Sequence, residues 1–348
     1  MTVKHQSSLV LEGGGSRGVF TAGVLDYLME KEVKFPYVVG VSAGSCNALD
    51  YVSWQPGRTR DCMIIEDKAN SYIATKEALK KHELFDMDML FDKYPNELFP
   101  FDFDTFFQSD TECELVVTNC QTGDAEYMTE KHDRRRLMDI GRASSSIPVV
   151  SPMVEIDGVP YLDGGIADSI PLIHAMEKGY RKNVVILTRN MGYRKKKPGK
   201  STPLYVAAFR HYPEFLNTLY NRYRSYNRTL ELLEKWEREG HIFVIRPEIP
   251  TVGRAEANKE KLMAFYQHGY DVMKDHYEEL QAYLSRSAFQ QGLEVCFNKM
   301  VLVFQSTHGH DFFTAFRLRT ESQNRCDCAG VCGAICGGDW CGATTVAA

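Results

Sequence analysis

The fold is decided by the stretch Tyr37-Val38-Val39-Gly40-Val41-Ser42-Ala43-Gly44-Ser45, a short apolar run that ends in Gly-x-Ser-x-Gly. Residues that can start a helix follow it. The pattern predicts a strand, a tight turn and a helix, with the serine at the turn. Small residues on both sides let the chain reverse while the hydroxyl group stays exposed. Ser42 is therefore the first candidate for a covalent nucleophile.

A glycine-rich loop, Gly13-Gly14-Gly15-Ser16-Arg17-Gly18, follows the apolar run from Ser8 to Leu11. The apolar residues after the loop have the spacing of one buried helical face, so the loop opens a helix. Its Gly-x-Gly-x-x-Gly pattern also occurs in dinucleotide-binding folds, where an acidic residue ends the next strand. Here the next predicted strand, Tyr37 to Val41, has no acidic residue, which disfavours a dinucleotide site. We favour an oxyanion hole, because consecutive glycines can turn backbone N–H groups toward one point and the helix dipole favours negative charge there.

A third motif, Asp163-Gly164-Gly165, follows a predicted hairpin over residues 154–162 with an Asp-Gly turn. Two interpretations stay open for it: an ordinary turn, or a carboxylate placed where other backbone comes close. An ordinary serine triad needs a histidine, yet none of the ten histidines stands in a motif, and His174 is predicted to lie on a surface helix. Direct activation of Ser42 by Asp163 requires burial that raises the aspartate pKa, or proton transfer concerted with attack.

Alternating strands and helices predict an α/β fold with a mostly parallel sheet and helices on both faces. The 348 residues, 44% of them hydrophobic, suit one large catalytic domain, 1–285, and a C-terminal extension, 286–348. Residues 66–110 form an aromatic-rich insertion that either lines a pocket as a cap or packs a small core of its own. Residues 193–236 form a basic and aromatic helical segment, interpreted as a solvated surface or as a lipid-facing patch.

The net charge of −5 gives no reason to expect nucleic acid as a partner. The N-terminus lacks the apolar core of a signal peptide, and no stretch is apolar for long enough to span a bilayer. We therefore expect a cytoplasmic protein, which would be peripheral to a membrane if residues 193–236 face lipid. The tail has cysteine density that suits a metal site, but its spacings do not match Cys-x-x-Cys pairs, and we favour a flexible tail and no cofactor. Its cysteines are Cys326, Cys328, Cys332, Cys336 and Cys341.

The three motifs resemble those of the patatin-like phospholipase family in type and in chain order: first the glycine loop, then Gly40-Val41-Ser42-Ala43-Gly44, then Asp163-Gly164-Gly165. The segments 143–148 and 168–171 also look like the family's flanking segments, and the resemblance covers roughly Ser8 to Leu284. It implies a three-layer α/β/α fold with a mostly parallel central sheet, a modified form of the α/β-hydrolase fold. It further implies a catalytic dyad of Ser42 as nucleophile and Asp163 as general base. The remaining implied site residues are Gly40 and Gly44 of the elbow, Gly164 and Gly165 after the aspartate, and Gly13, Gly14, Gly15, Ser16, Arg17 and Gly18 of the oxyanion hole.

The resemblance implies metal-independent cleavage of acyl esters of (lyso)phospholipids or other glycerolipids through an acyl-enzyme. An acyl-thioesterase or transacylase with the same dyad is the first alternative. A nucleotide-binding enzyme that uses the glycine loop and a non-catalytic lipid-binding protein are the others. Acyl chain length, headgroup, positional preference and oligomeric state stay open.

Overall fold

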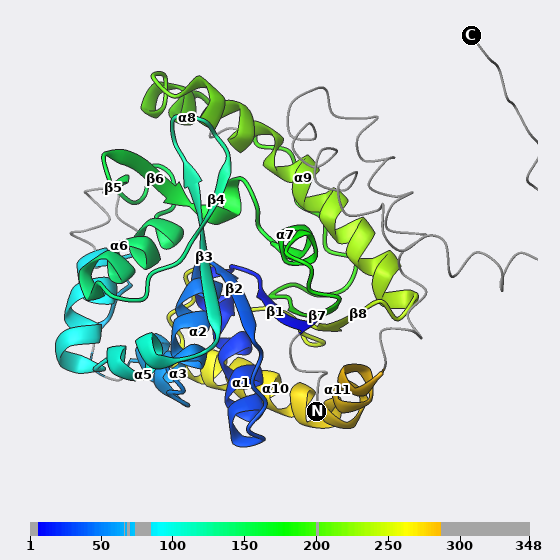
Figure 1. Cartoon of the computed structure of the whole chain (residues 1–348). Helices are drawn as coiled ribbons and strands as arrows, with labels where there is room; N and C mark the ends of the chain where they lie inside the picture. The colour runs from blue at the N-terminus through cyan, green and yellow to red at the C-terminus, as the bar shows by residue number, and fades with distance from the viewer. Residues whose placement is uncertain (1–5, 66, 68–69, 74–84, 200–201, 287–348) are drawn as a thin grey trace, which may run out of the picture. The chain divides into compact units, whose positions relative to one another are not determined.

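The computed structural model describes residues 6–65, 67, 70–73, 85–199 and 202–286 (Figure 1). The chain divides into two compact units, 1–290 and 291–348. The second unit, with all five tail cysteines, lies outside the described residues. The expected domain boundary after residue 285 therefore stays a prediction.

One mixed sheet forms the centre of the first unit. Within the described part of the chain it has eight strands, in the order β5-β6-β3-β2-β1-β7-β8, with β4 paired to β3. The strands are β1 (Ser7–Leu11), β2 (Tyr37–Val41), β3 (Glu112–Asn119), β4 (Ala125–Met128), β5 (Val154–Ile156), β6 (Val159–Asp163), β7 (Lys182–Ile186) and β8 (Ile242–Ile245).

Helices and helical turns connect these strands. They are η2 (Gly15–Arg17), α1 (Gly18–Glu30), α2 (Ala43–Val52), α3 (Arg58–Met63), the π-helix η4 (Met89–Leu98), α5 (Phe103–Gln108), α6 (Arg134–Ser145), η5 (Gly164–Ile166), α7 (Leu172–Glu177), α8 (Thr202–Ala208), α9 (Pro213–Arg238), α10 (Lys259–Asp275) and α11 (Tyr277–Ser285). The helices α10 and α11 meet at His276. Among the described residues, no helix combines the length and apolar character needed to cross a bilayer.

Strands β3, β2, β1, β7 and β8 run parallel, whereas β4, β5 and β6 join the sheet by antiparallel pairs. Each of these parallel strands contains an apolar run, as residues 9–11 of β1 illustrate, because both faces of the sheet are covered. β1 and β2, for example, are buried along their whole length. The hairpin of β5 and β6 turns at Asp157 and Gly158, whose φ angles of 53° and 79° match the expected Asp-Gly turn.

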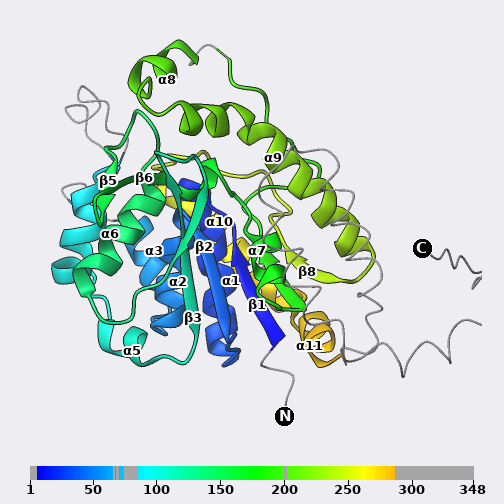
Figure 2. The ribbon, with the colours of Figure 1, turned by 45° about the horizontal axis from the view of Figure 1, so that its top comes forward.

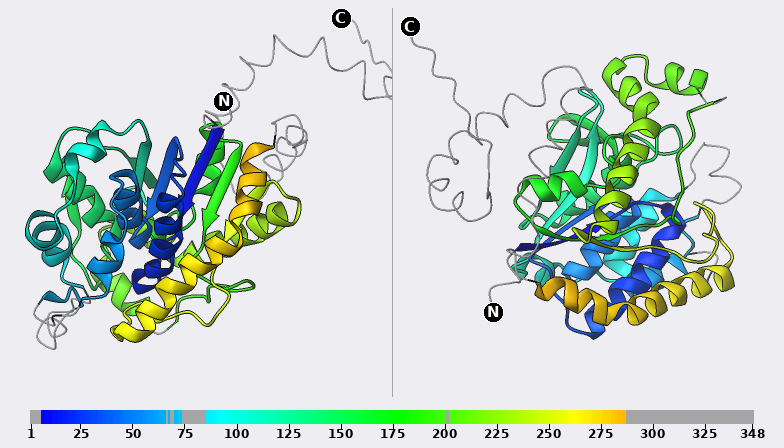
Figure 3. Two further views of the ribbon diagram at one scale, coloured as in Figure 1. Left: turned by 90° about the horizontal axis from the view of Figure 1, so that it is seen from below. Right: turned by 90° about the vertical axis from the view of Figure 1, so that its right-hand side faces the viewer.

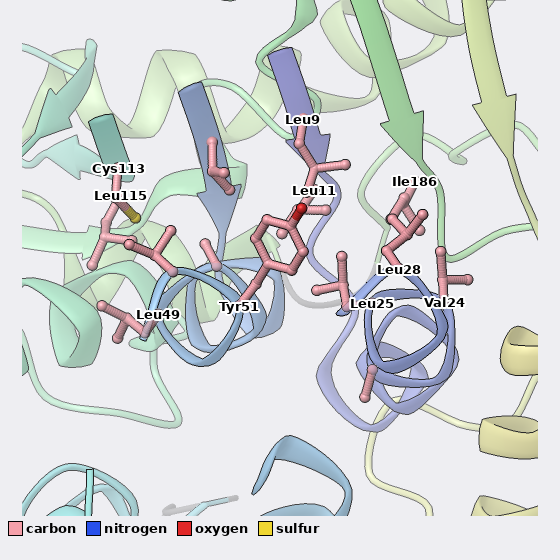
Figure 4. Close-up of a cluster of buried hydrophobic side chains, with 14 of the residues drawn as sticks. Leu9, Leu11, Val24, Leu25, Leu28, Leu49, Tyr51, Cys113, Leu115 and Ile186 are labelled. Carbon is pink, nitrogen blue, oxygen red and sulfur yellow. The ribbon is translucent and has the colours of Figure 1, made fainter. Parts of the chain in front are cut away.

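Helices cover the sheet on both sides, with α1 and α10 on one side and α9 on the other (Figures 2 and 3). The core lies between the strands and the helices α1 and α2, where Leu9 and Leu11 of β1 meet Leu25 and Leu28 of α1 (Figure 4). The expected three-layer α/β/α architecture with a mostly parallel central sheet is confirmed.

Candidate active site

The elbow after β2 forces Ser42 into a conformation that is rare for a residue with a side chain. Its φ is 56° and its ψ is −123°. The turn is tight enough that a Cβ atom on Gly40 would lie 2.3 Å from the carbonyl oxygen of Gly44. Ser42 is partly exposed while both of its neighbours in sequence are buried. The structure thus presents this hydroxyl at the carboxyl end of the parallel strands.

Hydroxyl groups from α2 and α6 hold the elbow. The backbone N–H of Ser42 donates to Ser144 Oγ at 3.0 Å, and the Ser144 hydroxyl donates to the carbonyl of Val116 on β3 at 2.6 Å. Ser45 Oγ lies 2.7 Å from Ser144 Oγ and 2.9 Å from the carbonyl oxygen of Gly40. Sequence reasoning recognised residues 143–148 only as a flanking segment. The run of small polar residues there was the available signal for this role.

The glycine loop lies directly against the elbow, because a Cβ atom on Gly13 would be 2.9 Å from Ser42 Cβ. Within the described part of the chain, the N–H groups of residues 13–15 donate no hydrogen bond, and all three residues line the same cavity as Ser42. Ser16 and Gly18 lie outside this cavity: the N–H of Ser16 donates to the carbonyl of Arg254 at 2.8 Å, and that of Gly18 faces the carbonyls of η2. Of the glycine loop, residues 13–15 therefore combine a place in the cavity with N–H groups that have no acceptor in the described part of the chain.

Glu12, to which sequence reasoning gave no role, anchors this loop. Its buried carboxylate accepts hydrogen bonds from the backbone N–H of Thr188 at 2.7 Å and from the hydroxyl of Tyr226 on α9 at 2.5 Å. Burial and the Glu12 carboxylate raise the pKa of Tyr226, so this hydroxyl stays a donor. An acid directly before three glycines was the only local signal.

Asp163 reaches the site from the antiparallel side of the sheet. β3 lies between β2 and β6: its Val116 pairs with Val41, directly before Ser42, and its Val117 pairs with Asp163. The Asp163 side chain is buried, and its Oδ1 accepts a hydrogen bond from the Gly165 N–H at 2.8 Å. No hydrogen bond among the described residues joins Ser42 and Asp163, but both side chains line one cavity. Such bonds are often long before a substrate binds.

Ser42 stands where two cavities meet. The first has a volume of about 130 Å³ and is polar; the glycine loop, Asp163 and several basic side chains line it. The second has a volume of about 100 Å³ and is mostly apolar, lined by α2 and by the insertion 66–110. Gly15, Ser42 and Ile147 belong to both. The arrangement suits an ester whose acyl chain and polar group lie on opposite sides of the serine.

Comparisons with known proteins assign part of the chain to a family. Residues 9–176 match the family model of the patatin-like phospholipases. The chain carries a patatin-like phospholipase domain. The resemblance drawn from the motifs is thereby confirmed, although the match ends at residue 176 rather than near 284. Residues 212–285 match a second family, described as a domain of unknown function, DUF6363.

Two proteins illustrate how the domain relates to known chains. The uncharacterized protein YjjU of Escherichia coli K12 is 33% identical to this chain over 184 residues. The match covers 52% of this chain and 51% of YjjU, so the chain spans about half the length of this curated relative. The crystal structure of VipD from Legionella pneumophila superimposes with a TM-score of 0.43 and 14% sequence identity; the superposition covers 79% of this chain and 67% of the VipD chain.

The described aromatic residues of the insertion lie in two clusters. Phe85 and Phe91 line the apolar pocket and pack with Tyr72 and Tyr94, whereas Phe103 and Phe106 pack in the main core. The described part of the insertion therefore forms one wall of the pocket, and its role as a cap stays a prediction.

A buried ion pair lies on the wall of the apolar pocket. Arg58 Nη1 is 2.6 Å from Asp50 Oδ1, and the hydroxyl of Thr59 donates to the other carboxylate oxygen of Asp50 at 2.6 Å. Cys46, close to Ser42 on α2, also lines this pocket, and burial raises the pKa of its thiol to about 11. This thiol is thus kept in its neutral form.

The other sequence candidates lie away from the two cavities. His174 stacks on the ring of Tyr127 at 3.4 Å and its Nε2 is 2.6 Å from Glu114 Oε2, so it is part of a polar cluster on β3 rather than a bare surface residue. Gly164 packs against the Val116 carbonyl and does not line the cavity. Among the described residues, no group of three or more metal-ligating side chains is placed to hold an ion, and the tail cysteines lie outside that range.

Proposed function

We propose that the chain is a serine acyl hydrolase that cleaves acyl esters of (lyso)phospholipids or other glycerolipids through Ser42 and Asp163. One observation carries the proposal: the strained, partly exposed Ser42 stands at the junction of an apolar pocket and of a polar cavity that contains a buried aspartate. The match to the patatin-like phospholipases supports lipid acyl hydrolysis as the reaction class. The apolar pocket takes the acyl chain, and the polar cavity takes the rest of the lipid.

In the proposed mechanism, Ser42 Oγ attacks the ester carbonyl while Asp163 takes the hydroxyl proton. The N–H groups of residues 13–15 stabilise the oxyanion. Collapse of the tetrahedral intermediate releases the alcohol, which receives the proton from Asp163, and leaves the acyl group on Ser42. Asp163 then deprotonates a water molecule that attacks the acyl-enzyme, and the proton returns to Ser42 as the fatty acid leaves.

The test is labelling with a fluorophosphonate probe, followed by peptide mapping, together with turnover of phospholipid, lysophospholipid and acyl-thioester substrates. Ser42→Ala should abolish labelling. Ser42→Ala and Asp163→Asn should each reduce turnover by about 10³-fold or more. The double variant should show no further loss, because the two residues act as one unit. Asp157→Asn, an exposed position in the same hairpin, is the matched control. Full activity in Ser42→Ala would refute the proposal. Preferred cleavage of the thioester would favour the thioesterase alternative, and vesicle binding without labelling would favour a non-catalytic protein.

Contact with a lipid surface through α8 is also part of the proposal. Leu204 and Val206 on this helix are 55% and 44% exposed, and the basic residues Lys196 and Lys197 precede it in the sequence. Exposed apolar side chains with nearby basic residues are typical of peripheral membrane contacts. Co-sedimentation with anionic vesicles should weaken when Leu204 and Val206 are both replaced by serine. Unchanged co-sedimentation would exclude α8 as the contact.

A further inference from the structure

The polar cavity beside Ser42 carries more positive charge than the proposed reaction uses. Its lining includes the five basic residues Arg17, Arg189, Lys195, Arg222 and Arg254, against the two acids Glu12 and Asp163. Both carboxylates already accept hydrogen bonds, Glu12 from Thr188 and from Tyr226 on α9, and Asp163 from its own turn. The cavity therefore has an excess of cationic groups over the anions that the protein itself supplies.

These cations have unmet hydrogen-bonding capacity. Among the described residues, the buried Nε atoms of Arg17 and Arg222 have no hydrogen-bond partner. Buried donors without partners are rare in folded proteins, so these two call for a partner that the described part of the chain does not supply. None of the five basic residues forms an ion pair with another described residue. A bound anion would satisfy both the charges and these donors.

The cations lie on the side of Ser42 that faces away from the acyl pocket. Arg189, Lys195, Arg222 and Arg254 line the polar cavity and not the apolar one. Arg222 comes close to the proposed base, because a Cβ atom on Gly165 would be 3.0 Å from both Arg222 Nη2 and Asp163 Oδ1. An ester with its acyl chain in the apolar pocket would thus place its polar end among these four residues.

The aromatic rings of this cavity are already covered by cations. The guanidinium carbon of Arg189 lies 4.3 Å from the centre of the Tyr193 ring, and Lys195 Nζ lies 4.2 Å from that of Tyr226. A quaternary ammonium group such as choline needs open aromatic faces or an excess of negative charge. The carboxylates of Glu12 and Asp163 are outnumbered by the five basic residues, so the cavity disfavours choline and favours an anion.

Resting on the proposed acyl hydrolase function, we propose that Arg189, Lys195, Arg222 and Arg254 bind the phosphate group of an anionic glycerolipid. The enzyme then prefers lipids whose head is a phosphate with net negative charge over choline lipids and over glycerides that lack phosphate. Guanidinium groups suit this role because their paired donors match phosphate oxygens.

The electrostatics of the empty cavity agree with this assignment. Burial, with the nearby Arg222 and Arg254, lowers the pKa of Lys195 to about 6, although the charges of Glu12 and Asp163 oppose the shift. A bound phosphate would stabilise the charged ammonium group, so binding near pH 7 should take up a proton from solvent. Burial, with Arg189 and Arg254, likewise lowers the pKa of Arg17 to about 10.

The decisive substrate pair is 1-acyl lysophosphatidate and the monoacylglycerol with the same chain, which differ only in the phosphate. We expect wild-type protein to prefer the phosphate-bearing substrate. Arg222→Gln and Lys195→Gln should each lower kcat/KM for it about 10- to 100-fold, the usual range for a lost hydrogen bond between charged groups, with little effect on the monoacylglycerol. Arg224→Gln, an exposed arginine on the same helix, is the matched control. Equal losses on both substrates, or no loss on either, would overturn the proposal.

Binding measurements separate a lipid headgroup from free phosphate and keep the two proposals distinct. The Ser42→Ala protein is titrated with sn-glycerol 3-phosphate by calorimetry, in buffers of different ionisation enthalpy. Binding should take up a proton, and this proton uptake should disappear when Lys195→Gln is added. Inorganic phosphate should compete with lysophosphatidate; independent binding of the two would assign the cations to free phosphate and overturn the lipid assignment. If wild-type protein cleaves no ester, the proposed function fails. The anion site would still stand if wild-type protein binds glycerol 3-phosphate and Arg222→Gln does not. Absence of that binding would overturn the site even where esters are cleaved.

Discussion

Replacing Gly13 by alanine tests whether the glycine loop holds the oxyanion. A Cβ atom at this position would lie 2.7 Å from the carbonyl oxygen of Val41 and 2.9 Å from Ser42 Cβ. Because non-bonded carbon atoms settle at about 3.5–4.0 Å, the loop and the elbow would have to move apart by about 0.6–1 Å. This displacement falls between the proposed nucleophile and its proposed oxyanion donors.

The expected consequence is a loss of turnover that exceeds the loss of stability. A misplacement of about 1 Å costs on the order of 100-fold in rate, and loss of an oxyanion donor costs about 10²- to 10³-fold. We therefore expect kcat for a short-chain ester to fall about 100- to 1000-fold in Gly13→Ala. Overpacking costs about 1–3 kcal/mol, so the variant should still fold. The KM should change little, since the apolar pocket keeps its shape.

The measurements are kcat and KM with a short-chain p-nitrophenyl ester, the rate of fluorophosphonate labelling and the melting temperature. Gly199→Ala is the control, because a Cβ atom there would have no neighbour within 4 Å. Labelling should slow in parallel with turnover, since the probe also develops negative charge at the oxyanion position. If Gly13→Ala is folded and keeps kcat within about threefold of wild type, the loop does not serve the reaction in the way proposed.

Three other perturbations address the pocket, the core and the polar cluster. Cys46→Phe should displace two or three methylene groups of a long acyl chain from the apolar pocket, and burial of each group contributes about 0.8 kcal/mol. The value of kcat/KM for long-chain esters should therefore fall by about 15- to 60-fold, while that for acetate esters should not change. Arg58→Met should lower the free energy of unfolding by about 3–5 kcal/mol in urea titrations, because it leaves Asp50 as an unpaired buried charge; a loss below about 1 kcal/mol would show that the pair is dispensable. Burial raises the pKa of Glu114, but the hydrogen bonds that it accepts outweigh burial and lower the pKa below its ordinary value of 4.5. The ionised carboxylate therefore stabilises the fold above pH 4.5, and this stabilisation is lost as the pH falls through the folded-state pKa. The melting temperature of Glu114→Gln should accordingly lie below that of wild type at about pH 7, and the difference should shrink in acid.

The elbow was predictable because its determinants are local. The pattern around Ser42 predicted a strand over 37–41 and a helix from Ala43, and both have these limits in the structure. The hairpin before Asp163 was equally local, since the turn at Asp157 and Gly158 sets its register. What no local pattern could supply is that this hairpin pairs antiparallel with β3, which brings the aspartate beside the elbow. The assignment of Asp163 therefore rested on the family resemblance.

Two elements were missed for identifiable reasons. β4 is a partly exposed edge strand without a strong apolar pattern, so its sequence does not separate it from a loop. α6 begins with three arginines, which obscure its apolar face. Asp133, whose side chain caps this helix by accepting hydrogen bonds from the N–H groups of Arg135 and Arg136, was a usable start signal.

The cations of the polar cavity could not be assembled from the sequence. Lys195 belongs to a basic run that we interpreted as a solvated surface or as a lipid-facing patch, yet its side chain is partly buried in the cavity. Arg222 lies on a long helix whose composition resembles a surface helix. Each residue has an unremarkable local context, and only the packing of α9 against the end of β7 brings them together with Glu12. Charge patterns in sequence do not reveal which basic residues face inward.

This packing bears on what the segment after the patatin-like match contributes. The match ends at residue 176, but β7 and β8 of the parallel sheet follow it, and Arg222 and Tyr226 lie within the second matched segment, 212–285. Tyr226 donates to Glu12 immediately before the glycine loop, and α10 packs on α1 with the rings of Phe20 and Phe265 5.5 Å apart. The second segment thus completes both the core and the polar wall of the cavity. Under the proposed chemistry, residues 9–176 supply the nucleophile, the base and the acyl pocket, while the chain after residue 176 supplies the four cations that select the headgroup, two of them from the second matched segment. Headgroup preference should therefore vary with the sequence of α9 among proteins that keep the same three motifs.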